Sequence, residues 1–143
     1  MSVKQINVFL ENESGRLFEV TRGLAKAGID IRSLYIADTT EYGILRILVN
    51  QPDDAQIVLQ NLGFTVSQTS VIAVAIPDTP GTLDGVLEVL SANNISLEYI
   101  YAFVGRASSD AVVVIRVDDP EKALKYLEEA GVKVLEDKEV YGI

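Results

Sequence analysis

The sequence contains no cysteine and no histidine. The chain can therefore form no disulfide, and it lacks a thiolate nucleophile, an imidazole base and the nitrogen and sulfur ligands that metal ions most often find in proteins. No pair of carboxylates is marked by its position as a general acid and a general base. Because most common catalytic devices are missing, we expect a protein that is not an enzyme, holds no metal and uses no cofactor.

Long apolar runs and positive charge are also scarce. No stretch approaches the roughly 20 apolar residues that span a bilayer, and the N-terminal residues, MSVKQ, do not have the form of a signal peptide. The 12 lysines and arginines stand against 21 aspartates and glutamates, so the mean field of the protein would repel a phosphate backbone. We therefore expect a cytoplasmic protein that binds neither membranes nor nucleic acid.

The chain carries an imperfect internal repeat. The segment 78–83 (DTPGTL) echoes the segment 12–17 (NESGRL), and the turn glycines Gly15 and Gly81 are 66 positions apart. Apolar residues match at the same offset. They are Ile6, Val8, Leu10, Val20 and Leu24 in the first repeat, and Ile72, Val74, Ile76, Val86 and Leu90 in the second. In the later part of each repeat the offset is 68, as Pro52 with Pro120 and Gly63 with Gly131 show. The repeat predicts two small domains, 1–69 and 70–143. We expect them to pair, because a lone unit of about 60 residues buries only about 60% of its unfolded surface.

The hydrophobic periodicity gives each unit the order strand, helix, strand, strand, helix, strand. In the first unit it predicts strands at 4–11, 29–37, 44–49 and 64–67. Helices are expected after Gly15 and from Pro52, ending at Gly28 and Gly63. The second unit repeats this order, which is the ferredoxin-like βαββαβ arrangement with both helices on one face of a four-stranded antiparallel sheet.

The second strand of each unit lies at a sheet edge in this topology. The strand at 95–104 carries aromatic residues in alternation, and an exposed edge of this kind tends to aggregate unless it is covered. We therefore expect it to pair with the strand at 29–37. The result would be an α+β protein with two ferredoxin-like units side by side, an eight-stranded antiparallel sheet and four helices on one face. The sheet residues expected to face the helices are Leu45, Ile47, Val49, Val113, Ile115 and Val117.

A tandem of two such units, each with an Asn- or Asp-x-x-Gly-x-Leu turn before its first helix, resembles the ACT domain family of small-molecule regulatory modules. The resemblance covers about residues 4–140. The turn at 78–83 fits the family closely, whereas the turn at 12–17 has Ser14 where proline is usual. The resemblance implies amino-acid binding at the interface between two units, through the residue three before the turn glycine and the polar residue that opens the second strand. On this chain those positions are Asn12 and Asp30, and Asp78 and Ser96.

These residue types suit a free amino acid, whose ammonium and carboxylate groups are two bonds apart. Asp30 and Asp78 can accept hydrogen bonds from the ammonium, and the Asn12 amide can serve either group. The N–H groups that follow Gly15 and Gly81 are expected at helix N-termini, where an anion is favoured and where glycine lets a ligand approach the backbone. The predicted ligand-binding residues are Asn12, Gly15, Asp30, Asp78, Gly81 and Ser96.

Each candidate also has a simpler structural explanation. Thr79 could cap a helix that begins at Pro80, and Glu13 or Ser14 could cap the earlier helix in place of Asn12. The two turn glycines could serve the backbone conformation alone. Asp30 and Ser96 could be ordinary polar residues on the outward side of a strand.

Three functional hypotheses remain. The first is a non-catalytic regulatory protein that binds a small amino acid or related metabolite between two ACT-like units. The second is a ligand-free structural or interaction module that acts as the regulatory subunit of a metabolic enzyme. The third, an enzyme, is disfavoured by the lack of histidine and cysteine. A homodimer or an enzyme partner is compatible with either of the first two.

Overall fold

The computed structural model describes residues 3–11, 13–38, 42–104 and 110–142 of the 143-residue chain. The elements, in chain order, are β1 (Val3–Glu11), α1 (Arg16–Lys26), β2 (Ile31–Asp38), β3 (Tyr42–Val49), α2 (Pro52–Asn61), β4 (Val66–Pro77), α3 (Thr82–Ala92), β5 (Leu97–Val104), β6 (Asp110–Val117), α4 (Pro120–Glu129), β7 (Lys133–Leu135) and α5 (Asp137–Tyr141). They divide into an N-terminal unit, Lys4–Thr69, and a C-terminal unit, Ser70–Tyr141, which also includes Val3. None of the described helices has both the length and the apolar character needed to cross a membrane.

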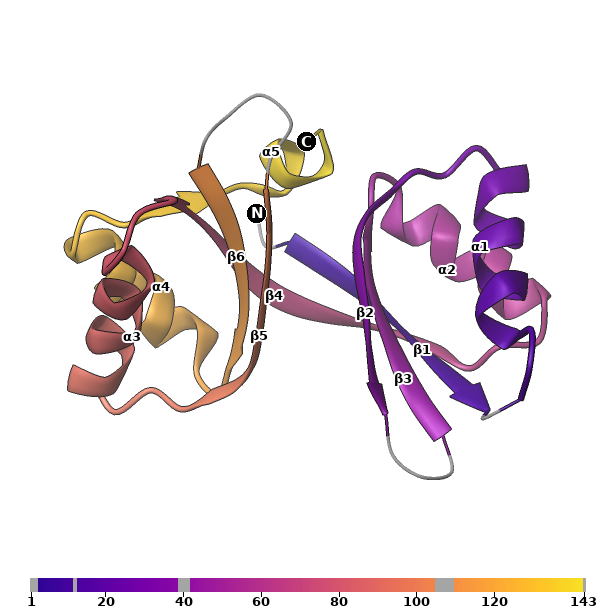
Figure 1. The fold of residues 1–143 in the computed structure, drawn as a ribbon, viewed down its shortest axis with the longest axis horizontal. Coiled ribbons are helices and arrows are strands. Elements are labelled where there is room, and N and C mark those ends of the chain that lie inside the picture. The colour runs from indigo at the N-terminus through magenta and orange to yellow at the C-terminus, as the bar shows by residue number, and fades with distance from the viewer. Residues whose placement is uncertain (1–2, 12, 39–41, 105–109, 143) are drawn as a thin grey trace. The chain divides into compact units, whose positions relative to one another are not determined.

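The N-terminal unit has the strand order β2-β3-β1-β4. β3 is antiparallel to both neighbours, with Val8 of β1 opposite Leu45 and Leu34 of β2 opposite Ile47. Helices α1 and α2 cover one face of this sheet (Figure 1). This is the ferredoxin-like order that the sequence pattern predicts.

The C-terminal unit repeats the plan with the order β5-β6-β4 and with β7 on β4. Val74 of β4 lies opposite both Val113 of β6 and Val134 of β7, and all of these pairings are antiparallel. Helices α3 and α4 cover one face of the sheet (Figure 1). The internal repeat in the sequence is therefore a repeat of structure.

Each unit has its own apolar core between its sheet and its two helices. The alternation in β1 places Ile6, Val8 and Leu10 toward the buried residues of α1 and α2, and Ile72, Val74 and Ile76 face α3 and α4 in the same way. The third-strand residues predicted to face the helices, Leu45, Ile47, Val49, Val113, Ile115 and Val117, all belong to these cores. Burying each large aliphatic side chain stabilises the fold by about 1.5–3 kcal/mol.

The described residues form seven strands rather than the eight of the expected sheet. The strand predicted at 64–67, the spacer at 68–70 and the first strand of the second unit form one continuous strand, β4, of 12 residues. The spacer residues Gln68, Thr69 and Ser70 include no glycine or proline that would interrupt an extended backbone. The expected pairing of the strand at 95–104 with the strand at 29–37 stays a prediction.

The sequence pattern also missed a fifth helix, α5, at Asp137–Tyr141. Its start resembles a capping box, because the Glu139 carboxylate accepts a hydrogen bond of 3.1 Å from the Glu136 N–H. Val140 is fully buried and anchors the helix. A helix of five residues is too short for its hydrophobic periodicity to be recognised in the sequence.

Candidate functional site

The turn at 78–83 begins α3 in the C-terminal unit. Gly81 is the N-cap residue and has φ +92°, a backbone conformation that favours glycine. A Cβ at this position would meet nothing within 4 Å, so the backbone conformation, rather than close packing, explains the glycine. The hydroxyl of Thr82 lies 2.7 Å from the carbonyl oxygen of Pro77 and closes the turn. The alternative in which Thr79 caps the helix is wrong, because α3 begins at Thr82.

The Asp78 carboxylate is exposed in this turn. Within the described part of the chain it makes no ion pair and no side-chain hydrogen bond. The first N–H groups of a helix have no partner inside the helix, and Gly81 supplies no side-chain acceptor for those of α3. The Thr82 N–H donates to the Thr79 carbonyl at 3.4 Å, so the donors left at this helix start are the N–H groups that follow it. The turn therefore combines an anionic acceptor, Asp78, with backbone donors at the N-terminus of α3, where the helix dipole favours negative charge.

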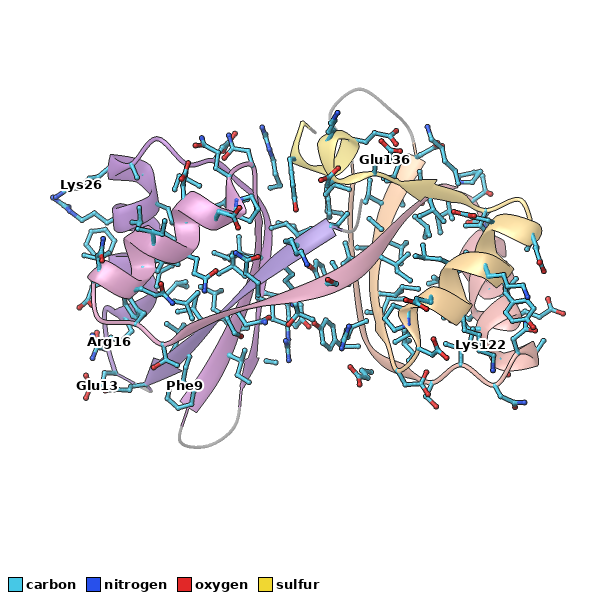
Figure 2. The ribbon with its side chains drawn as sticks, turned by 180° about the vertical axis from the view of Figure 1, so that it is seen from behind. Phe9, Glu13, Arg16, Lys26, Lys122 and Glu136 are labelled. Atoms are coloured by element: carbon cyan, nitrogen blue, oxygen red, sulfur yellow. The ribbon has the colours of Figure 1, made fainter. Side chains whose placement is uncertain are left out.

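The described part of the first turn, 13–17, has a similar backbone to the second turn but a different charge. Gly15 is the N-cap of α1 with φ +87°, while Asn12 lies outside the described residues. Arg16, the counterpart of Thr82, lies 3.4 Å from Glu11, 3.7 Å from Glu13 and 3.1 Å from Glu19. Figure 2 shows Arg16 and Glu13 close to each other at the start of α1. This turn already holds a cation among three carboxylates.

The Glu19 and Glu11 carboxylates raise the pKa of Arg16 above its ordinary value by accepting hydrogen bonds from the guanidinium. The guanidinium also lies over the ring of Phe64, 5.7 Å from its centroid. Arg16 is therefore held at the first turn by contacts with carboxylates around that turn and with Phe64, in the segment between α2 and β4. At the equivalent position of the second turn, Thr82 carries no charge.

The structure does not bring the turns together with the openings of the second strands inside one unit. Asp30 and Ser96 lie beyond the C-terminal ends of α1 and α3, whereas Gly15 and Gly81 lie at the N-terminal ends. Each of these helices has 11 residues and is therefore about 16 Å long. One small ligand cannot contact both positions within the same unit.

Asp30 and Ser96 instead take part in a repeated backbone arrangement. The Asp30 N–H donates to the Asn50 side chain at 3.0 Å, and the Asn50 N–H donates to the Asp30 carbonyl at 3.2 Å. Ser96 and Asp118 form the same two bonds, at 3.0 and 3.1 Å. The Asp30 carboxylate also pairs with Arg32 at 2.9 Å. Sequence reasoning missed Asn50 and Asp118, although both follow the third strand at the repeat offset of 68.

No metal centre is indicated in the part of the chain that the structure describes. Among those residues, no group of three or more aspartates or glutamates is arranged to hold an ion. The acidic segment 118–121 has structural roles instead. Asp118 accepts from Ser96, and Asp119 caps α4 by accepting from the Lys122 N–H at 3.1 Å.

Two ferredoxin-like units, each with a glycine-capped turn between its first strand and first helix, define a tandem α+β domain protein. A family model described as an ACT domain pair matches residues 1–143, and the chain belongs to this family. The resemblance seen in the sequence is thus confirmed. No curated protein matches the chain.

Solved structures share this architecture. Protein BT0572 from Bacteroides thetaiotaomicron is 40% identical and superposes with a TM-score of 0.95, over 100% of this chain and 98% of that one. The regulatory subunit of aspartate kinase from Thermus thermophilus, in a ligand-free form, is 19% identical with a TM-score of 0.62, over 91% of this chain and 93% of that subunit. At 19% identity, the similarity to the aspartate kinase subunit shows a shared fold.

Proposed function

We propose that this chain is a non-catalytic regulatory protein that binds a small amino acid or a related metabolite through the turn at 78–83. The observation that carries the proposal is the exposed Asp78 carboxylate beside the N-terminus of α3. Membership of the ACT domain pair family supports a regulatory role.

The chemistry of the turn matches both charged groups of an amino acid. Its ammonium would donate to Asp78, and its carboxylate would accept from the first N–H groups of α3. An ammonium about 4 Å from a carboxylate gains roughly 4 kcal/mol at an effective dielectric constant near 20, before desolvation is subtracted. We expect a dissociation constant in the micromolar to millimolar range, about −8 to −4 kcal/mol.

The turn at 12–17 is the weaker candidate for the same ligand. An incoming ammonium would meet the positive charge of Arg16, and the nearby carboxylates already pair with that guanidinium. Asp30 is likewise engaged with Arg32. We therefore propose one ligand per chain, held at the second turn.

The contribution of a second unit remains a proposal. A ligand at Asp78 that also contacts a residue such as Asp30 or Ser96 would need the second strand of a unit other than the one that holds Asp78. This follows from the length of α3, which separates Gly81 from Ser96 within one unit. The division into ACT-like domains at 1–69 and 70–143 supplies the two units that such a site requires.

The alternative function is a ligand-free regulatory subunit of a metabolic enzyme. The occupied turn around Arg16 favours it for the N-terminal unit, because that turn has its own cation. The regulatory subunit of aspartate kinase shows that an enzyme subunit can have this tandem fold.

A thermal-shift screen against the twenty common amino acids and related acids tests the proposal. A ligand at about 100 times its dissociation constant stabilises a protein by about 2.7 kcal/mol, which moves the midpoint of a protein of this size by several degrees. We expect one amino acid, or one chemical class, to raise the midpoint. If no compound raises the midpoint, the result would favour the ligand-free regulatory subunit.

A further inference from the structure

A pocket in the C-terminal unit lies away from the turn at 78–83. It has a volume of about 350 Å³ and is lined by residues of β4, α4 and the junction of β7 with α5, together with Val3 at the start of β1. Its lining is mainly apolar, with Ile72 and Leu124 among its walls, and it carries two carboxylates, Glu128 and Glu136. Pockets for small molecules have volumes from about 300 Å³ upward and combine apolar walls with a few polar groups.

The pocket follows from the short last strand and from one face of α4. β7 pairs with Ala73–Ala75 and ends at Leu135, so it does not extend along Ser70–Ile72. Pro120, Leu124 and Glu128 are four residues apart on α4 and therefore lie on one face of the helix. Ala123 and Leu127 of the same helix are buried in the core, and Leu124 is partly buried against that core.

The N-terminal unit has a different arrangement at the equivalent place. At the repeat offset of 68, Gln68 corresponds to Glu136 and Gln56 corresponds to Leu124. The Gln68 amide donates to Gln56 at 2.7 Å and to Asp53 at 3.0 Å, and so links the strand to α2. The N-terminal unit closes this position with its own side chains.

The C-terminal unit cannot make that link. The Glu136 carboxylate has no N–H to donate, and Leu124 has no oxygen to accept. Glu128 replaces Gln60, so a second negative charge stands at the same pocket. In the described part of the chain neither carboxylate has a side-chain partner, and no lysine or arginine lines the pocket. Figure 2 shows Glu136 where β7 meets α5.

We propose that this pocket binds a small aliphatic ammonium ion, with its hydrocarbon part against Ile72 and Leu124 and its ammonium accepted by Glu128 and Glu136. A cation is favoured because the two ionisable residues of the lining, Glu128 and Glu136, are both acidic and exposed, and the chain carries a net charge of −9. A free amino acid is disfavoured, since its own carboxylate would add a third negative charge. The pocket would thus select an amine over the corresponding amino acid.

The test is a titration of the ¹⁵N-labelled full chain with isobutylammonium chloride, followed by amide chemical shifts. We expect saturable shifts at Ser70–Ile72, Leu124–Glu128 and Val134–Glu136, and none of that pattern with isobutanol or L-valine. Shifts that isobutanol reproduces, or that map elsewhere, would overturn the proposal. The readout is residue-specific, so it is independent of amino-acid binding at Asp78.

Matched variants test the role of charge. Glu128→Gln and Glu136→Gln should each weaken the amine at least about threefold, whereas Glu129→Gln, which removes a charge from α4 outside this pocket, should leave the dissociation constant unchanged. The double change Leu124→Gln with Glu136→Gln copies Gln56 and Gln68 and should abolish the shifts. Equal binding by the Glu136→Gln variant and the unaltered protein would contradict the assignment.

Discussion

The backbone N–H of Ser96 donates a hydrogen bond of 3.0 Å to the Asp118 carboxylate, and the Asp118 N–H donates one of 3.1 Å to the Ser96 carbonyl. Asp30 and Asn50 exchange the same two bonds in the N-terminal unit. In each unit the exchange fixes the start of the second strand against the end of the third. The residues that open the second strands therefore have a structural role, whether or not they also contact a ligand.

Asp118→Ala should lower the free energy of unfolding by about 1 kcal/mol, because it leaves the Ser96 N–H without its acceptor. Asp118→Asn is the matched control, since it keeps the side-chain oxygen that Asn50 provides in the other unit. It should remain close to the unaltered protein. Urea unfolding of both variants checks this, and equal losses for alanine and asparagine would refute the role of the side-chain oxygen.

Alanine substitutions at Gly81 and at Gly85 should change the stability of the protein in opposite directions. Gly81→Ala should destabilise the protein by about 1–2 kcal/mol, because φ at Gly81 is +92°. Gly85→Ala should stabilise it by about 0.5–1 kcal/mol, because Gly85 lies within α3 and a Cβ there meets nothing within 4 Å. Thermal and urea midpoints provide the measurement. A neutral effect at Gly81 would show that the turn does not require a left-handed residue.

The hydrogen bonds of Gln68 can be tested by replacing it with glutamate, the residue at the equivalent position, Glu136, of the C-terminal unit. Gln68→Glu removes the donor to Gln56 and Asp53 and places a carboxylate near Asp53, so it should cost about 1 kcal/mol of stability. Gln60→Glu introduces the same charge on α2 and should change stability by less than about 0.5 kcal/mol. Identical urea midpoints for the two variants would mean that the link contributes nothing.

The charges around Arg16 predict a salt-dependent effect. Arg16→Thr, which copies Thr82, should reduce stability at low ionic strength, and the difference should shrink as salt rises from about 0.05 M to about 0.5 M. Because the folded-state pKa of Arg16 is raised, its contribution should persist as pH rises from about 7 to about 10 and be lost only above its ordinary value. Urea unfolding at two salt concentrations measures the effect. A difference that grows with salt would exclude ion pairing as its cause.

The sequence predicted the parts of the fold that depend on periodicity. The alternation of Ile6, Val8 and Leu10, and its copy at the offset of 66, correctly assigned the faces of β1 and β4. It could not assign the pairing of strand edges, because side-chain alternation reports which face is buried and not which strand is the neighbour. The continuous β4 was missed for a related reason, since residues 68–70 are polar without breaking the strand.

The local structure around the candidate residues was predicted in part, while their role in ligand binding stays a prediction. Gly15 and Gly81 were found because a glycine before a helical pattern is a strong local signal, and both are helix N-caps. The hydrogen bonds of Asn50 and Asp118 were not predicted. Their partners, Asp30 and Ser96, lie 20 and 22 residues earlier in the chain, beyond the range of local sequence patterns. The pocket at Glu136 depends on where β7 ends, which the sequence does not specify.

The most direct test of the central claim is a calorimetric titration of the amino acid that the thermal screen identifies, using the unaltered protein, Asp78→Asn and Asp54→Asn. The two variants lose the same charge, and Asp54 lies in the first turn of α2, in the other unit. We predict one ligand per chain, at least tenfold weaker binding by Asp78→Asn, which is about 1.4 kcal/mol, and unchanged binding by Asp54→Asn. Binding by Asp78→Asn that equals that of the unaltered protein would contradict the assignment of the ligand to the second turn.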